Sequence, residues 1–370
     1  VLLGAMIVVG VVLVACGAAT TTSTEAPTTE APAAPSVEVP NLEAWQGSGH
    51  NDVAGEPFRH WDDAAANPDG VPTSCAKCHT SAGYQDYLGV DGSEAGKVDA
   101  AVPAANAQGI QCVTCHNAVT FTKTTVMFPS GVEIKAGDDT RCMECHQGRE
   151  SKVSVDAAIA KFGENVDPDA VPAPFKDDKG NDVKLGFRNV HYFAAAATLY
   201  GSETHGGYEY DGNTYDAKNT HVEGYATCTG CHNPHTLEVK VEQCANCHEG
   251  VATVDDLKDV RMVASAKDYD GDGNVEEGMY YEIQGLQETL MAEITKYAMD
   301  KAGAAIVYSP DAYPYFFADT NANGTVDEGE AVFASVGEQK QESGPRDQFH
   351  RPLECGAGHL QADGASRPLQ

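Results

Sequence analysis

The sequence contains Cys75-Ala-Lys-Cys78-His79, and the same Cys-x-x-Cys-His pattern returns four more times before residue 249. The further copies are Cys112-Val-Thr-Cys115-His116, Cys142-Met-Glu-Cys145-His146, Cys228-Thr-Gly-Cys231-His232 and Cys244-Ala-Asn-Cys247-His248. A chain with this cysteine and histidine content would carry on the order of 0.01 copies by chance. The pattern therefore reflects a chemical requirement, and that requirement decides how residues 75–248 fold.

Each copy predicts the covalent attachment of one haem. Two thiols at this spacing can add to the two vinyl groups of a porphyrin, and the His that follows supplies an axial nitrogen to the iron. Zinc also binds Cys-x-x-Cys pairs, in groups of four sulfurs, but five pairs do not divide into such groups. The motifs use ten of the twelve cysteines and leave only Cys16 and Cys355, so no disulfide framework is predicted. We predict five haem c groups.

The start of the chain predicts export. Residues 1–15 are almost entirely apolar but shorter than the roughly 20 residues that span a bilayer, as is typical of a signal-peptide core. Leu13-Val-Ala-Cys16 resembles a bacterial lipobox, so we expect residues 1–16 to be a lipoprotein signal with a truncated start and a lipid on Cys16. The alternative is a plain signal peptide or short anchor. The lipid would hold the protein on the outer face of the cell membrane or cell surface.

The residues behind the signal divide by composition. Residues 17–40 are rich in Thr, Ala and Pro and are expected to form a disordered tether. Residues 41–250 are expected to form a pentahaem cytochrome domain. Because residues 75–248 provide only about 35 residues per haem, the porphyrins must fill much of the interior. We expect a mainly irregular fold with short α-helices, few strands and a core organised around stacked haems.

An iron that only carries electrons needs a second axial ligand, and imidazole is the usual one. Eight His lie outside the motifs. The five in the most suitable contexts are His50, His60, His191, His221 and His235, and His205 is the reserve. The fourth and fifth motifs begin 16 residues apart, which predicts neighbouring haems. The 86 residues from the third to the fourth motif are expected to cross back over the haems with distal ligands.

Residues 251–339 carry 18 acidic and 5 basic side chains and are expected to form a small helical calcium-binding region. One helix is expected from about Glu282 to Ala302, with an apolar stripe formed by Ile283, Leu286, Leu290, Ile294 and Tyr297. Residues 319–330 fit the twelve-residue EF-hand loop. The predicted ligands there are Asp319, Asn321, Asn323, Thr325, Asp327 and Glu330. An earlier loop begins in the same way, with Asp268, Asp270, Asp272, Asn274 and Glu276. Met279 stands where its closing Glu belongs. We expect one or two calcium ions, with solvated acidic turns as the alternative.

The last residues, 340–370, show no periodicity and are expected to be a disordered tail. Cys355-Gly-Ala-Gly-His359 keeps the Cys-to-His spacing of a haem motif without the second Cys, and a lone Cys near a His rarely binds haem. The net charge of −31 excludes nucleic acid as a partner for want of a basic patch. It favours cationic redox partners, oxidised metal ions or a calcium-bridged cell wall.

Two further segments strengthen the resemblance that the haem motifs suggest. Together with Phe58-Arg-His60-Trp61 and Gly206-Gly-Tyr-Glu-Tyr210, the motifs resemble the exported multihaem c-type cytochromes of bacteria that respire with extracellular or cell-surface acceptors. The resemblance covers roughly residues 45–250. It implies bis-His haems close enough for fast electron hopping and, in some relatives, assembly into haem-wired filaments. The expected partners are other redox proteins, such as cytochromes and quinol-oxidising membrane complexes, or extracellular acceptors.

Three functions agree with these features. The first is a non-enzymatic electron conduit, in which the protein sets the reduction potential through bis-His ligation and burial. The second is a reductase or dehydrogenase of a small nitrogen or sulfur compound, with one five-coordinate haem. The chain departs from the pentahaem nitrite reductases because all five motifs end in His and none in Lys. The third is a subunit of a haem-wired homopolymer.

Overall fold

The computed structural model describes residues 38–163, 175–176, 179–180, 182–183, 188–261, 264–310, 315–327 and 329–330. Contacts divide the chain into two units, Val1–Pro40 and Asn41–Gln370, and every helix and strand described belongs to the second. The predicted lipoprotein signal with Cys16 and nearly all of the tether lie outside the described residues. So do the predicted tail and Cys355.

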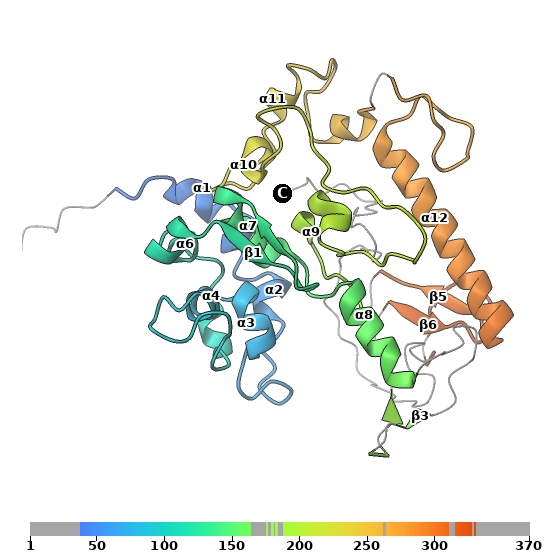
Figure 1. Cartoon of the computed structure of the whole chain (residues 1–370), viewed down its shortest axis with the longest axis horizontal. Helices are drawn as coiled ribbons and strands as arrows, with labels where there is room; N and C mark the ends of the chain where they lie inside the picture. Colours follow the sequence, from blue (N-terminus) through green and yellow to red (C-terminus); the bar gives the residue numbers. More distant parts are fainter. Residues whose placement is uncertain are drawn as a thin grey trace, which may run out of the picture. The chain divides into compact units, whose positions relative to one another are not determined.

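Short helices make up most of the regular structure of residues 41–250 (Figure 1). They are α1 (Leu42–Gln46), α2 (Glu56–Arg59), α3 (Thr73–His79), α4 (Ser81–Tyr87), α5 (Cys112–Cys115), α6 (Ala118–Thr122), α7 (Thr140–His146), α8 (Lys152–Ile159), α9 (Ala195–Tyr200), α10 (Cys228–Cys231) and α11 (Val241–Cys244). Five of them, α3, α5, α7, α10 and α11, contain residues of the haem motifs. The 3-10 helices are η1 (Gly49–Asn51), η2 (Ala104–Asn106), η3 (Gly137–Asp139), η4 (Ala160–Phe162), η5 (Gly201–Glu203) and η6 (Asp255–Asp259). Two antiparallel pairs complete this part: β1 (Thr125–Met127) with β2 (Glu133–Lys135), and β3 (Phe175–Lys176) with β4 (Asp182–Val183).

The helix of the first motif, α3, ends at its His, His79. Thr80 follows the first motif in an extended conformation, and its hydroxyl accepts a hydrogen bond from the Gly83 amide at 2.9 Å, which caps the next helix, α4. The two helices pack so closely that a Cβ on Gly83 would lie 2.4 Å from the carbonyl oxygen of Ala76. Only glycine fits there. The first motif is thereby fixed against the helix that follows it.

Two small clusters of apolar side chains form the core around the motifs. One joins β1, β2, α7 and α9 through residues that include Val126, Ile134, Met143 and Ala197. The other gathers Trp61, Val71, Ala76, Val102 and Ala107. Ala76 and Met143 are the first residues between the cysteines of their motifs, and both are buried. Burial of that position anchors the helices of the first and third motifs to the protein, while their cysteines remain partly exposed.

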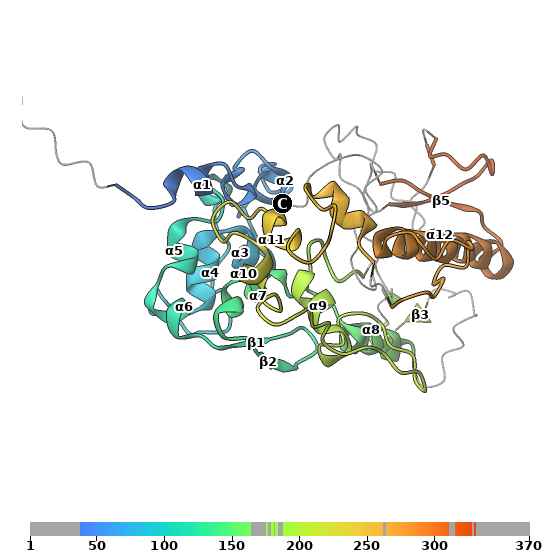
Figure 2. The ribbon, with the colours of Figure 1, turned by 90° about the horizontal axis from the view of Figure 1, so that it is seen from above.

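The acidic region is built differently. Its longest helix among the described residues is α12 (Met279–Tyr297), which continues as a π-helical turn, η7 (Ala298–Ala302), and packs on η6 (Figure 2). An antiparallel pair follows, β5 (Ile306–Tyr308) with β6 (Phe316–Ala318). The predicted apolar stripe of the helix is half exposed, with Leu286 at 44% and Leu290 at 46%, whereas Glu282 is fully buried. No described helix has the length and apolarity to cross a membrane.

Candidate haem-binding sites

The ten motif cysteines carry free thiols, as attachment to a porphyrin requires. Three of the motif His have their Nδ1 atoms hydrogen-bonded at 2.9 Å to a backbone carbonyl: His79 to Pro57, His146 to Phe193 and His232 to Leu237. Because Nδ1 must donate to a carbonyl, the proton is fixed on that nitrogen and Nε2 keeps its lone pair. These three rings are oriented as metal ligands.

Three motif His face a second His across a gap of similar width. The ring centroids are 6.0 Å apart for His79 and His191, 6.1 Å for His116 and His235, and 6.0 Å for His248 and His221. Imidazole nitrogens bind transition metals at about 2.0–2.1 Å and lie about 1 Å from the ring centroid, so two imidazoles on one metal have centroids about 6 Å apart. The structure thus brings together three of the five predicted distal His with three motif His, at a spacing that fits one iron each.

The remaining predicted distal ligands lie elsewhere around the motifs. His50 lies near enough to His146 for the charges to interact. His60 packs against Trp61, and its Nδ1 atom pairs with the carboxylate of Glu56. His205, the reserve candidate, has its Nδ1 atom 2.7 Å from Glu209. Among the described residues, no second His ring faces His146 or His232 in the way seen at the other three motifs.

Apolar side chains surround the facing His, as a porphyrin requires. Phe121 is 54% exposed in the protein alone, and its ring centroid lies 5.8 Å from that of His116. Val113 and Val119 on the same motif segment are also exposed. Solvent-exposed apolar groups gathered at one place mark a binding surface. Thiols, imidazoles with a free Nε2 and an apolar lining together fit a haem.

Buried His side chains make the folded chain sensitive to acid. Burial lowers the pKa of His50 to about 4, and the neighbouring His146 adds to the shift. Burial also lowers the pKa of His79 and of His146. The neutral form that folding favours is fully present above the ordinary pKa of 6.5, and its stabilising effect is lost as the pH falls towards 4. We expect the Tm to decrease from pH 7 to pH 4 in calorimetry. A Tm unchanged across this range would contradict the assignment.

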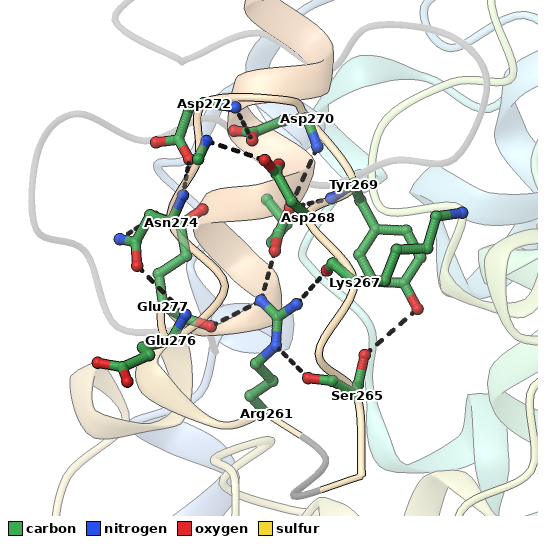
Figure 3. Close-up of polar contacts among 12 residues, drawn as sticks. Arg261, Ser265, Lys267, Asp268, Tyr269, Asp270, Asp272, Asn274, Glu276 and Glu277 are labelled. Atoms are coloured by element: carbon green, nitrogen blue, oxygen red, sulfur yellow. Dashed lines mark hydrogen bonds and ion pairs between the residues drawn. The ribbon is translucent and has the colours of Figure 1, made fainter.

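Carboxylates converge in the predicted calcium loop at residues 268–276 (Figure 3). Asp268, Asp270 and Glu282 have ligand atoms within 4.8 Å of one another, and so do Asp270, Asp272 and Glu277. The other two predicted ligands, Asn274 and Glu276, lie on the exposed side of the loop. The sequence pattern missed Glu277 and Glu282, because neither stands at the twelfth position.

Glu282 holds this loop from helix α12. Its carboxylate pairs with Arg261 and accepts hydrogen bonds from the amides of Tyr269 at 2.7 Å and Asp270 at 3.1 Å. Gly285 leaves the space for the carboxylate of Asp270, since a Cβ there would collide with it. The helix therefore fixes the loop by contacts that do not depend on a metal ion.

The second predicted calcium loop, at residues 319–330, closes on itself. Asp319 accepts hydrogen bonds from the amides of Asn323 at 3.0 Å and Gly324 at 2.8 Å. Glu330, at the twelfth position, accepts from the amides of Thr320 and Asp327. The remaining predicted ligands, Asn321 and Thr325, lie on the same turn. The first and last carboxylates are thus held by backbone amides of the loop, and among the described residues they do not converge as Asp268, Asp270 and Glu282 do.

These sites define the class of protein: a chain that attaches several haems through Cys-x-x-Cys-His motifs. The sequence is similar to two c-type polyheme cytochromes of Geobacter sulfurreducens. It is 27% identical to OmcB over 325 residues, which cover 76% of this chain and 34% of OmcB, and 25% identical to OmcC over 358 residues, which cover 78% and 39%. No protein-family model and no solved structure matches.

The chain thus spans between a third and two fifths of the length of the curated relatives it matches. The similarity supports a multihaem c-type cytochrome that binds haem covalently. The Cys-x-x-Cys-His motifs and the similar proteins therefore indicate the same class of protein, a multihaem c-type cytochrome.

Proposed function

We propose that the protein is an exported electron conduit that holds five haems, most of them between two His side chains. The observation that carries this proposal is the set of three His pairs at about 6 Å, His79 with His191, His116 with His235, and His248 with His221. When bound, each haem supplies an iron that takes up or releases one electron. With both axial positions occupied by the chain, no position remains for a substrate.

The chain's own residues would set the electron affinity of these sites. A carbonyl that accepts from Nδ1 makes Nε2 a stronger donor, as at His79, His146 and His232. A carboxylate in that role strengthens the donor further, and Glu56 and Glu209 offer one to His60 and His205. We propose His50 as the distal ligand for the third motif, because it lies near enough to His146 for their charges to interact.

We also propose where the protein works and which electron partners it has. The apolar residues 1–16 and the similarity to c-type polyheme cytochromes support a protein that works outside the cytoplasm. A lipid on Cys16 would hold it at the outer face of the membrane or at the cell surface. The net charge of −31 favours cationic redox proteins or oxidised metal ions as electron partners.

We further propose that calcium binds the two acidic loops and has a structural role. Three carboxylates within 4.8 Å of one another, as at Asp268, Asp270 and Glu282, repel strongly unless a cation lies among them. Arg261 supplies one positive charge to Glu282. In the second loop, Asp319, Asp327 and Glu330 follow the EF-hand order. We propose one or two calcium ions in residues 264–330, without a part in electron transfer.

The conduit is tested by counting haems and their spin states in the purified holoprotein. Mass spectrometry and the pyridine haemochrome assay are expected to give five haems per chain. Ferric haems with two imidazoles give low-spin EPR signals and do not bind carbon monoxide. A large high-spin ferric signal, or carbon monoxide binding to a haem of the native protein, would contradict full bis-His ligation.

The alternative of a reductase is kept because no second His ring faces His146 or His232 among the described residues. An open iron at either motif would offer a site for a small nitrogen or sulfur compound. Turnover of nitrite or hydroxylamine with a reduced dye decides between the two functions. Rates no higher than those of free haem remove the reductase.

The same observation favours the filament alternative, in which a neighbouring copy lends a distal His. Electron microscopy of native surface material distinguishes filaments from single molecules. An experimental structure with all five irons ligated from within one chain would remove this alternative in its strongest form.

A further inference from the structure

Glu144 is a buried carboxylate inside the third haem motif, and it forms ion pairs with two lysine side chains. Its Oε2 atom lies 3.0 Å from Nζ of Lys77, and its Oε1 atom lies 2.9 Å from Nζ of Lys123. Gln147 donates to Oε2 at 3.2 Å. The Glu144 side chain is fully buried, whereas those of Lys77 and Lys123 are 20% and 22% exposed. We refer to Lys77, Glu144 and Lys123 as the charge cluster.

The three members of the charge cluster come from three haem-attachment segments. Lys77 lies between the cysteines of the first motif, Glu144 between those of the third, and Lys123 directly behind helix α6, which follows the second motif. Thr140, at the start of α7, also donates its hydroxyl to the carbonyl of Lys123 at 3.0 Å. One carboxylate therefore connects the first three motifs.

The first and third motifs also meet in a reciprocal way. Lys77 and Glu144 hold the same place in their motifs, directly before the second cysteine. The sulfur of Cys78 lies 3.9 Å from the carbonyl oxygen of Glu144, and the sulfur of Cys145 lies 3.9 Å from that of Lys77. The motif helices α3 and α7 are in contact. The two sulfurs that would carry haems thus lie at one interface, with the charge cluster beside them.

The charge cluster carries a net charge at this interface. Two ammonium groups against one carboxylate leave one net positive charge, and burial of Glu144 keeps water from screening it fully. Removing one partner of a buried pair is also costly, because the remaining charge loses its compensation. The same three side chains can therefore hold the motifs together and act on the charge state of what the motifs bind.

We propose that Glu144 is a positioning residue that locks the first three haem-attachment segments together, and that the charge cluster raises the reduction potentials of the haems on the first and third motifs. The proposal rests on the electron-transfer function above. Reduction adds one negative charge at the iron, so a nearby ammonium group favours it and a nearby carboxylate opposes it. The cluster as a whole favours the ferrous state.

Single charge removals in the full-length holoprotein test this, because the two kinds of charge act with opposite sign. Lys77→Met and Lys123→Met are expected to lower the potentials of the same haems, and Glu144→Gln is expected to raise them. We expect changes on the order of tenfold in the reduction equilibrium, or about 59 mV for one electron. Redox titration followed by optical and EPR spectroscopy measures the potentials. Haem content and spin state are measured on each variant.

The matched control is Lys97→Met. Lys97 has the same chemistry, with Glu94 and Asp99 each 3.1 Å away, but it is 55% exposed and lies in no motif. Its removal is expected to leave all potentials unchanged. Equal shifts in the control, shifts of one sign in all three cluster variants, or none in any of them overturn the proposal.

Loss of folding is also informative. Each Lys variant leaves Glu144 paired with the other Lys, so both are expected to keep five low-spin haems even if Glu144→Gln does not. Unmoved potentials in both Lys variants, with five haems present, overturn the redox part and leave the conduit intact. Absence of five haems in the unaltered protein instead contradicts the proposed function itself.

Discussion

Replacing His235 by Ala is expected to turn one haem of the five from low-spin to high-spin and to make it bind carbon monoxide. His235 faces His116 at 6.1 Å with nearly parallel rings, and removal of its imidazole would leave the iron on the second motif with one axial ligand. The loop itself should persist, because the amide of residue 235 donates to Oδ1 of Asn233 whatever its side chain. EPR and carbon monoxide difference spectra of the holoprotein measure the change.

His235→Met is the matched variant. A thioether can take the place of the imidazole, so this haem should remain low-spin, and its potential should rise, because thioether ligation favours ferrous iron. Five unchanged low-spin haems in His235→Ala would show that His235 is not an axial ligand. A high-spin haem in both variants would show that the site does not accept a thioether, and it would leave the assignment of His235 standing.

Removal of calcium is expected to give the second large effect, a lower midpoint of thermal unfolding for the acidic region. An ion that binds only the folded state stabilises it by about 2.7 kcal/mol when its concentration is 100 times Kd. The carboxylates at Asp268, Asp270 and Glu282 would then repel one another, with only part of their charge offset by Arg261. Calorimetry with calcium and with a chelator measures the shift.

Glu330→Gln locates this effect in the second loop. It removes the predicted bidentate ligand at the twelfth position and keeps an oxygen acceptor for one of the two amides, of Thr320 and Asp327, that donate to the Glu330 carboxylate. Glu288→Gln, on the exposed face of α12, is the control and should behave as the unaltered protein. If calcium does not change the midpoint of thermal unfolding of the unaltered chain, both proposed calcium sites are wrong.

The sequence alone was sufficient for the parts of the site that depend on spacing. Cysteine and histidine in a fixed pentapeptide specify haem attachment without knowledge of the fold. The demand of iron for a second ligand selected five His, and three of these, His191, His221 and His235, each face a motif His in the structure. It did not reveal which motif each one faces, because that depends on contacts between residues up to 119 positions apart. His191 also has a φ of 89°, which no propensity rule predicts for His.

Buried charge was the main feature beyond the reach of sequence patterns. Glu144 occupies a variable position of its motif, and its burial depends on Lys77 and Lys123, which are distant along the chain. On α12 the apolar periodicity pointed to Ile283 and Leu286, yet the fully buried side chain is Glu282, because Arg261 and two backbone amides receive it. Pairing between segments decided both cases.

In the proposed conduit, the three His pairs would also set an order in which the haem sites are completed during secretion. A chain that crosses the membrane with its N-terminus first exposes His79 long before His191, 112 residues later, and His116 long before His235, 119 residues later. His221, by contrast, precedes His248 by 27 residues. When the fifth motif emerges, its proposed distal ligand, His221, is therefore already outside. The first and second motifs emerge long before their proposed distal ligands and would lack them during that interval. The earliest haems to be attached would be among the last to be enclosed, and they would stay exposed to the attachment machinery for longest.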